Sequence, residues 1–131
     1  MRHADWVARL RETVDAYRAE PFSWGRHNCG LFPARCVDAI TGSDFAREFQ
    51  FATARAALAF VKDSGGIEAA VTARLGKPTE GRCARRGDVC LVDVVDGDGL
   101  GICYGPEVLV ASDDGLESYA LARVRKHWRV G

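Results

Sequence analysis

A cysteine beside a predicted helix start is the residue in this sequence with the clearest chemical potential. Asn28 can cap that helix, because its side-chain oxygen can accept a hydrogen bond from a backbone N–H two or three residues later. Cys29 then falls in the first turn, where a helix carries about half a positive charge and favours the thiolate form of cysteine. The expected chemistry is nucleophilic catalysis by the Cys29 thiolate.

The residues after Cys29 show the period of a mostly buried helix. Its apolar face has the spacing of 3.6 residues per turn: Phe32, Cys36, Ala39 and Ile40. Gly42 is expected to end it, since glycine readily takes the left-handed conformation of a C-cap. Pro33 is tolerated only in the first turn, so the regular helix is predicted to begin a residue or two after Cys29.

The sequence around Cys29 resembles the NlpC-type cell-wall cysteine peptidases, and it is similar in particular to small NlpC-like proteins of tailed phages and prophages. The shared pattern is Trp24-Gly25-x-x-Asn28-Cys29, in which Trp24, Gly25 and Asn28 cap the helix and shape the site. Three later segments carry the rest of the match: residues 39–42 (Ala-x-Thr-Gly), 86–89 (Arg-Gly-Asp-Val) and 100–103 (Leu-Gly-Ile-Cys). The resemblance implies one papain-like domain over residues 1–131, with Cys29 as nucleophile.

The resemblance also implies a catalytic histidine that this sequence lacks. In NlpC-like proteins the histidine begins the second strand of the sheet, and that position falls here on Gly99. The third polar residue, on the following strand, would fall at Val110. Neither residue can accept a proton or orient a base, so the sequence is interpreted as a degenerate, inactive member of the fold.

Two histidines remain candidates for an unusual catalytic base that would take the proton from Cys29. His27 lies two residues before Cys29, and its side chain is expected to point away from the helix start. His127 lies in a basic tail and reaches the site only if that tail folds over it. A loop histidine and a solvated surface histidine are the competing interpretations.

The remaining polar clusters do not predict a metal site or a cofactor. The five cysteines are an odd number and include no Cys-x-x-Cys pair, so neither a disulfide framework nor structural zinc is indicated. Cys36, Cys90 and Cys103 fall in apolar segments and are expected to be buried, while Cys83 lies in an exposed basic loop. Asp96 and Asp98 lack the further acidic ligands of a calcium loop.

Length and charge restrict the class of protein. The 131 residues suit one domain, and 18 basic residues balance 18 acidic ones, which argues against a nucleic-acid surface. No apolar run approaches the roughly 20 residues that cross a bilayer. The N-terminus lacks the apolar core of a signal peptide, so synthesis in the bacterial cytoplasm is expected.

The chain order predicts an α+β fold, with helices first and an antiparallel β-meander after them. Helices are expected at about residues 5–18, 53–64 and 67–75 besides the Cys29 helix, with Asp5 and Thr53 as N-caps. Strands are expected at 88–94, 100–104, 108–111 and 116–119, with an Asp-Gly hairpin turn at 96–99. Residues 43–50 and 77–87 are predicted as connections. The tail 122–130 fits a strand or a short helix, whose Trp128 is expected to pack on the sheet.

Two functions of different class follow. The first is a structural or assembly part of a phage tail tip or baseplate, with other tail and hub proteins as partners and the virion tail as its location. The second is an active peptidoglycan hydrolase, an endopeptidase or amidase that uses Cys29 with His127 or a base supplied by a partner protein. A third interpretation is that Cys29 anchors a cofactor or a covalent contact in the assembled particle.

Overall fold

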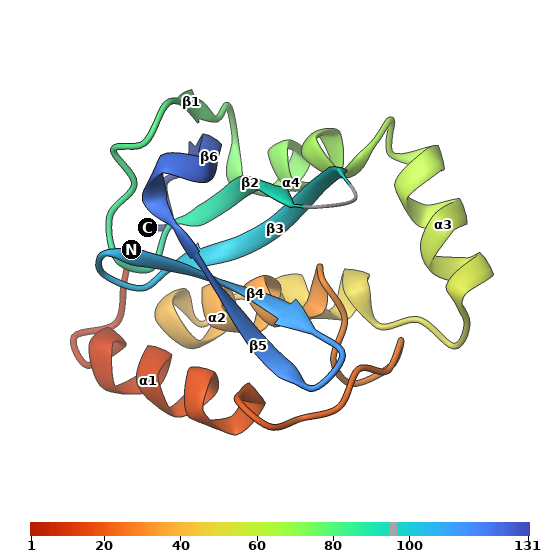
Figure 1. The fold of residues 1–131 in the computed structure, drawn as a ribbon, viewed down its shortest axis with the longest axis horizontal. Coiled ribbons are helices and arrows are strands. Elements are labelled where there is room, and N and C mark those ends of the chain that lie inside the picture. Colours follow the sequence, from red (N-terminus) through yellow and green to blue (C-terminus); the bar gives the residue numbers. More distant parts are fainter. Residues whose placement is uncertain (95–96) are drawn as a thin grey trace.

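The computed structural model describes residues 1–94 and 97–131, and within them helices precede a six-stranded antiparallel sheet (Figure 1). The helical segments are α1 (Trp6–Tyr17), α2 (Leu31–Thr41), the 3-10 turn η1 (Phe45–Phe49), α3 (Ala54–Asp63) and α4 (Ile67–Leu75). The remaining elements are β1 (Thr79–Glu80), β2 (Val89–Val94), β3 (Gly97–Cys103), β4 (Glu107–Ser112), β5 (Gly115–Ala120), the 3-10 turn η2 (Leu121–Arg123) and β6 (Val124–Trp128). The α+β fold predicted from the sequence is confirmed.

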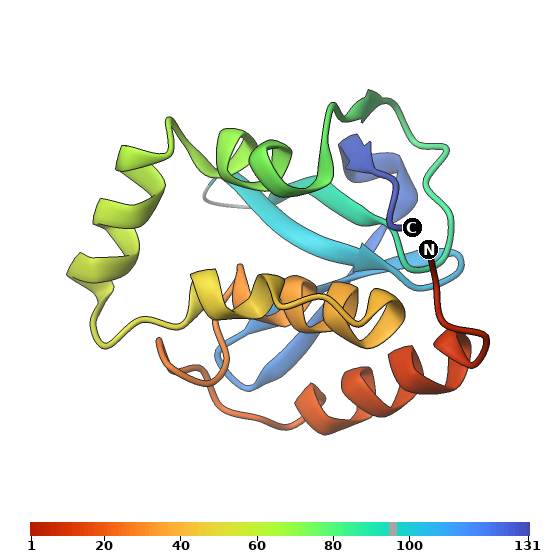
Figure 2. The same cartoon turned by 180° about the vertical axis from the view of Figure 1, so that it is seen from behind.

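Helix α2 is the buried centre of the helical layer. It packs between α1 and the sheet, where it contacts β3 and β4 (Figures 1 and 2). Its apolar face is buried as predicted, and Gly42 ends it with φ of 75° and an N–H that donates to Asp38 O at 2.7 Å. Helix α3 lies apart from this layer at one end of the molecule in both views. No helix of the described residues is long and apolar enough to cross a bilayer.

Besides the predicted meander, the sheet contains two further strands, β1 and β6. The strand order is β1-β6-β2-β3-β4-β5, so β2 to β5 follow the chain while β6 returns to pair with β2. The tail is therefore a short 3-10 turn followed by a strand. Trp128 at the end of β6 is fully buried, and its Nε1 donates to Thr72 Oγ1 of α4 at 3.2 Å.

The start of β3, the two predicted connections and the cap of α1 differ from the sequence predictions, whereas the predicted cap of α3 is confirmed. Strand β3 begins at Gly97 and not at residue 100; of the predicted 96–99 turn, Asp96 lies outside the described residues. The connections at 43–50 and 77–87 contain η1 and the short strand β1. Asp5 does not cap α1, because its carboxylate accepts instead from Arg9 Nε at 2.8 Å. Thr53 does cap α3, accepting from Ala56 N at 3.2 Å.

A buried carboxylate joins both ends of the chain to the sheet. Asp88, which precedes β2, is 2% exposed and accepts from Arg2 Nη2 at 3.1 Å. The backbone N–H groups of Val130 and Arg85 donate to the same carboxylate at 3.2 and 3.0 Å. The two chain termini accordingly lie close together in both views (Figures 1 and 2).

Candidate functional site

The backbone around Cys29 is held by the side chain of Asn28. Its Oδ1 accepts from the backbone N–H groups of Gly30 at 3.0 Å and Leu31 at 2.8 Å. Its Nδ2 donates to the carbonyl oxygens of Trp24 and Phe49, both at 2.8 Å. The predicted cap is confirmed, and because α2 begins at Leu31, Cys29 lies in the turn that leads into the helix.

Cys29 belongs to the wall of an apolar pocket of about 380 Å³. The pocket lies between the turn before α2, η1 and α3. Its lining residues are Trp24, Asn28, Cys29, Gly30, Phe49, Phe51, Ala54, Ala57, Leu58, Val61 and Ile67. Cys29 as a residue is exposed, and Leu58 at the pocket is 70% exposed, so the pocket opens to the surface.

The apolar surroundings of Cys29 outweigh the predicted effect of the helix start on its thiol. Although Cys29 as a whole residue is exposed, burial of its thiol group raises the pKa of that thiol above its ordinary value, and the backbone N–H groups of Cys29 and Gly30 lower it by less. The N–H groups at the helix start thus act in the predicted direction, but burial of the sulfur outweighs them. The half charge of a helix end is a small effect beside the removal of water from an ionised sulfur.

The alkylation rate of Cys29 should follow this raised pKa. Because only the thiolate reacts, the rate with iodoacetamide is expected to keep rising above pH ~8.5, where an ordinary thiol is half ionised. Mass spectrometry resolves the sites, with the exposed Cys83 as an internal control for the reagent. The fully buried Cys36 should stay unlabelled until the protein unfolds. A Cys29 midpoint below ~8.5 would contradict the expectation.

The structure places His27 on the other side of the segment that carries Cys29. Its ring stacks on Tyr17 of α1, with 4.8 Å between ring centroids, and meets Phe32 edge-on. Its Nε2 donates to Gly115 O of β5 at 2.7 Å, and the side chain is fully buried. His27 is a core residue that joins α1 to β5, and it does not line the Cys29 pocket.

His127 lies on β6, paired with Thr79 of β1 and Cys90 of β2. Its Nδ1 donates to Gly81 O at 3.3 Å. It lines a separate hollow of about 290 Å³, together with Cys83 and other residues of the basic segments. The basic tail therefore does not fold over Cys29, and the structure does not bring His127 to that pocket.

Gly99 and Val110, the positions of the missing polar residues, lie in the sheet as the resemblance implies. Gly99 is on β3 opposite Val92, and Val110 is on β4 opposite Gly101. A Cβ atom at Gly99 would lie 3.1 Å from Val94 Cγ1, so a larger side chain there requires Val94 to move. In the described part of the chain, these two strands supply no proton acceptor to the Cys29 pocket.

A family model described as a domain of unknown function, DUF6950, matches residues 1–130. The chain belongs to the DUF6950 family. Its match covers the helical layer and all six strands of the described structure, so the Cys29 pocket and the sheet are parts of one DUF6950 unit. No curated protein matches the chain.

Sequence reasoning missed the residues that make the DUF6950 site a pocket. Phe49 comes from the segment 43–50 that was predicted as a connection, Phe51 follows that segment, and α3 closes the opposite wall. The apolar positions Ala57, Leu58 and Val61 were visible in the sequence as one helix face. Their period could not show whether that face meets the core or a groove.

Proposed function

We propose that this DUF6950 chain is a non-catalytic assembly component of a phage or phage-like tail tip or baseplate, built on a degenerate NlpC-like fold. The observation that carries the proposal is the composition of the Cys29 pocket. Apart from Cys29 itself, none of its lining residues ionises near neutral pH. A thiol with a raised pKa and no neighbouring base is a poor nucleophile.

The same pocket is suited to binding. Its walls are almost entirely apolar, and it opens beside Leu58, which is among the most exposed large apolar side chains of the described chain. Apolar side chains that are exposed around a concave site mark protein contacts more often than isolated ones do. The proposed partner is a tail or hub protein that inserts an apolar side chain between η1 and α3.

Coexpression with the tail hub proteins of a tailed phage tests the proposal. A stable complex on size-exclusion chromatography is expected, and Leu58→Glu should weaken it at least about tenfold because a carboxylate would be buried in the contact. Val7→Glu is the matched control, since Val7 is another exposed apolar residue, 46% exposed on α1. A freely soluble monomer that binds no tail component, or equal loss in both variants, would count against the proposal.

The alternative function is a peptidoglycan hydrolase whose base comes from a partner protein. The exposure of Cys29 in the pocket wall favours keeping the hydrolase as the second candidate. The purified complex is therefore incubated with peptidoglycan, and no release of soluble fragments is expected. Turnover that disappears in Cys29→Ser would establish the hydrolase in place of the assembly component.

A further inference from the structure

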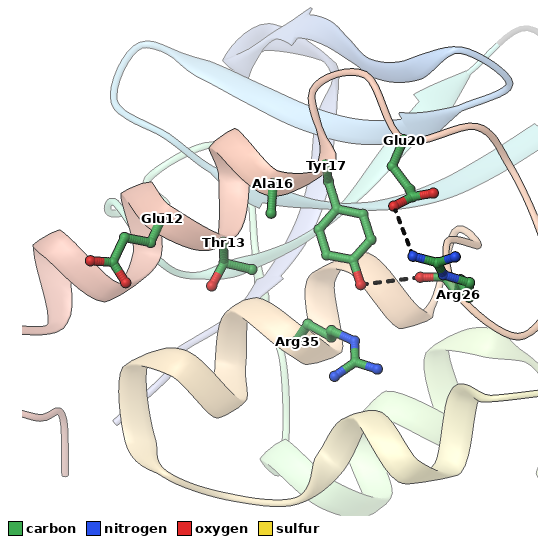
Figure 3. A pocket seen from close by; sticks show the side chains of 7 residues that line it. All are labelled: Glu12, Thr13, Ala16, Tyr17, Glu20, Arg26 and Arg35. Carbon is green, nitrogen blue, oxygen red and sulfur yellow. Dashed lines mark hydrogen bonds and ion pairs between the residues drawn. The ribbon is translucent and has the colours of Figure 1, made fainter.

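A second hollow, separate from the Cys29 pocket, lies between α1, the segment 18–30 and α2 (Figure 3). Its volume is about 440 Å³, within the range of small-molecule sites. Its lining residues are Glu12, Thr13, Ala16, Tyr17, Glu20, Arg26 and Arg35. Four of these seven carry a charge, which makes the hollow unlike the apolar pocket at Cys29.

Arg35 is the residue of this hollow that has a buried hydrogen-bond donor without an acceptor. Its side chain leaves α2 and ends below the Tyr17 ring (Figure 3). Its Nε is buried, and within residues 1–94 and 97–131 that N–H has no hydrogen-bond acceptor. Buried donors without a partner are rare in folded proteins and destabilise them. The Nε–H of Arg35 is therefore a donor that a ligand in the hollow could satisfy.

The neighbouring groups leave the Arg35 charge unneutralised. The Tyr17 hydroxyl donates its proton to Arg26 O at 3.1 Å. Burial raises the pKa of the Tyr17 phenol, and the positive charge of Arg35 and a hydrogen bond from its side chain oppose that rise. The Tyr17 hydroxyl is thus a neighbour of Arg35, but as a neutral group it does not balance the charge. The Arg26 guanidinium pairs with Glu20 at 3.6 Å. Among the described residues, no carboxylate forms an ion pair with Arg35.

The opposite charge in the hollow comes from α1. Glu12 is exposed, and its carboxylate makes neither a hydrogen bond nor an ion pair with the described chain. Once Arg26 and Glu20 have paired, one guanidinium from α2 and one carboxylate from α1 remain. A purely anionic ligand would meet repulsion from Glu12, and a purely cationic ligand would meet repulsion from Arg35. A ligand with one charge of each sign satisfies both.

We propose that this hollow is a binding site for a small zwitterionic amino carboxylate. The ligand carboxylate accepts from the guanidinium of Arg35, whose planar fork matches the two oxygens. The ligand ammonium lies toward Glu12, and its methylene groups contact Ala16 and the Tyr17 ring. The inference is independent of the tail-tip proposal, because Cys29 and Leu58 are not in the walls of this hollow.

Titration with 4-aminobutyrate, glycine and β-alanine, followed by NMR shifts of α1 and α2 amides, tests the site. Butyrate and butylamine are the matched probes, since each keeps one of the two charges. The amino carboxylate with the best-fitting length is expected to bind at least about tenfold more tightly than either. No saturable shift up to about 10 mM for any amino carboxylate, or equal binding of butyrate, would overturn the proposal.

Variants identify the residues responsible. Arg35→Met should weaken amino-carboxylate binding at least about tenfold, with a melting temperature unchanged or higher because the orphaned N–H is gone. Arg55→Met is the matched control on the exposed surface of α3 and should bind as the wild type does. Glu12→Gln should reduce the preference for 4-aminobutyrate over butyrate. Unchanged affinity in Arg35→Met, or in Arg35→Lys should Arg35→Met fail to fold, would refute the assignment.

Discussion

Replacing Asp88 by alanine is expected to lower the free energy of unfolding by about 3–5 kcal/mol, as breaking a buried ion pair does. The substitution leaves the Arg2 guanidinium, whose side chain is 17% exposed, without its carboxylate. It also removes the acceptor of the Val130 and Arg85 N–H groups. Because these donors come from both ends of the chain and from the loop before β2, all three segments should loosen together. Urea denaturation measures the change.

Asp93→Ala is the matched control for Asp88. Asp93 also pairs with an arginine, Arg125 at 3.2 Å, but its side chain is 58% exposed. A solvent-exposed ion pair contributes about 0–1 kcal/mol, so this variant should unfold nearly as the wild type does. A similar small loss for Asp88→Ala would mean that water replaces the carboxylate at the chain ends.

Features of the fold that depend on near neighbours could mostly be predicted from the sequence, and the cap of α1 by Asp5 is the exception. The cap of α2, its end at Gly42 and the cap of α3 by Thr53 each involve groups within four residues of one another. The pairing of β6 with β2 could not be predicted, because no local sequence pattern specifies which strand the C-terminal segment pairs with. The role of Asp88 was hidden for the same reason: Arg2 lies 86 residues away along the chain.

The candidate site, like the fold, has features that the sequence predicts and features that it does not predict. The place of Cys29 before α2 followed from Asn28, its neighbour in sequence. The raised pKa of the Cys29 thiol could not be predicted in this way, because it depends on burial beside Phe49, Phe51 and α3, which the fold brings to the pocket. The contact of His27 with Gly115, 88 residues later, likewise had no signal near either residue. A motif predicts where a nucleophile lies, whereas its reactivity is set by residues outside the motif.

Asn28→Ala is expected to lower the free energy of unfolding by about 2–4 kcal/mol, more than the loss of an ordinary helix cap. An ordinary cap residue accepts from one or two backbone N–H groups, as Thr53 does from Ala56. Asn28 in addition donates to the carbonyl oxygens of Trp24 and Phe49. The variant leaves buried groups without partners on both sides of the amide. Urea denaturation of Asn28→Ala and Thr53→Ala, side by side, measures the difference.

Asn28→Asp separates the two halves of this network. The carboxylate keeps an acceptor for Gly30 and Leu31 but has no donor for Phe49 O. It should therefore retain the cap while releasing η1 from the turn before α2. Since Phe49 is a wall of the Cys29 pocket, the release should admit water to the thiol and speed Cys29 alkylation at fixed pH. If Asn28→Asp leaves that rate unchanged, the pocket is held by apolar packing alone, and the amide serves only the helix.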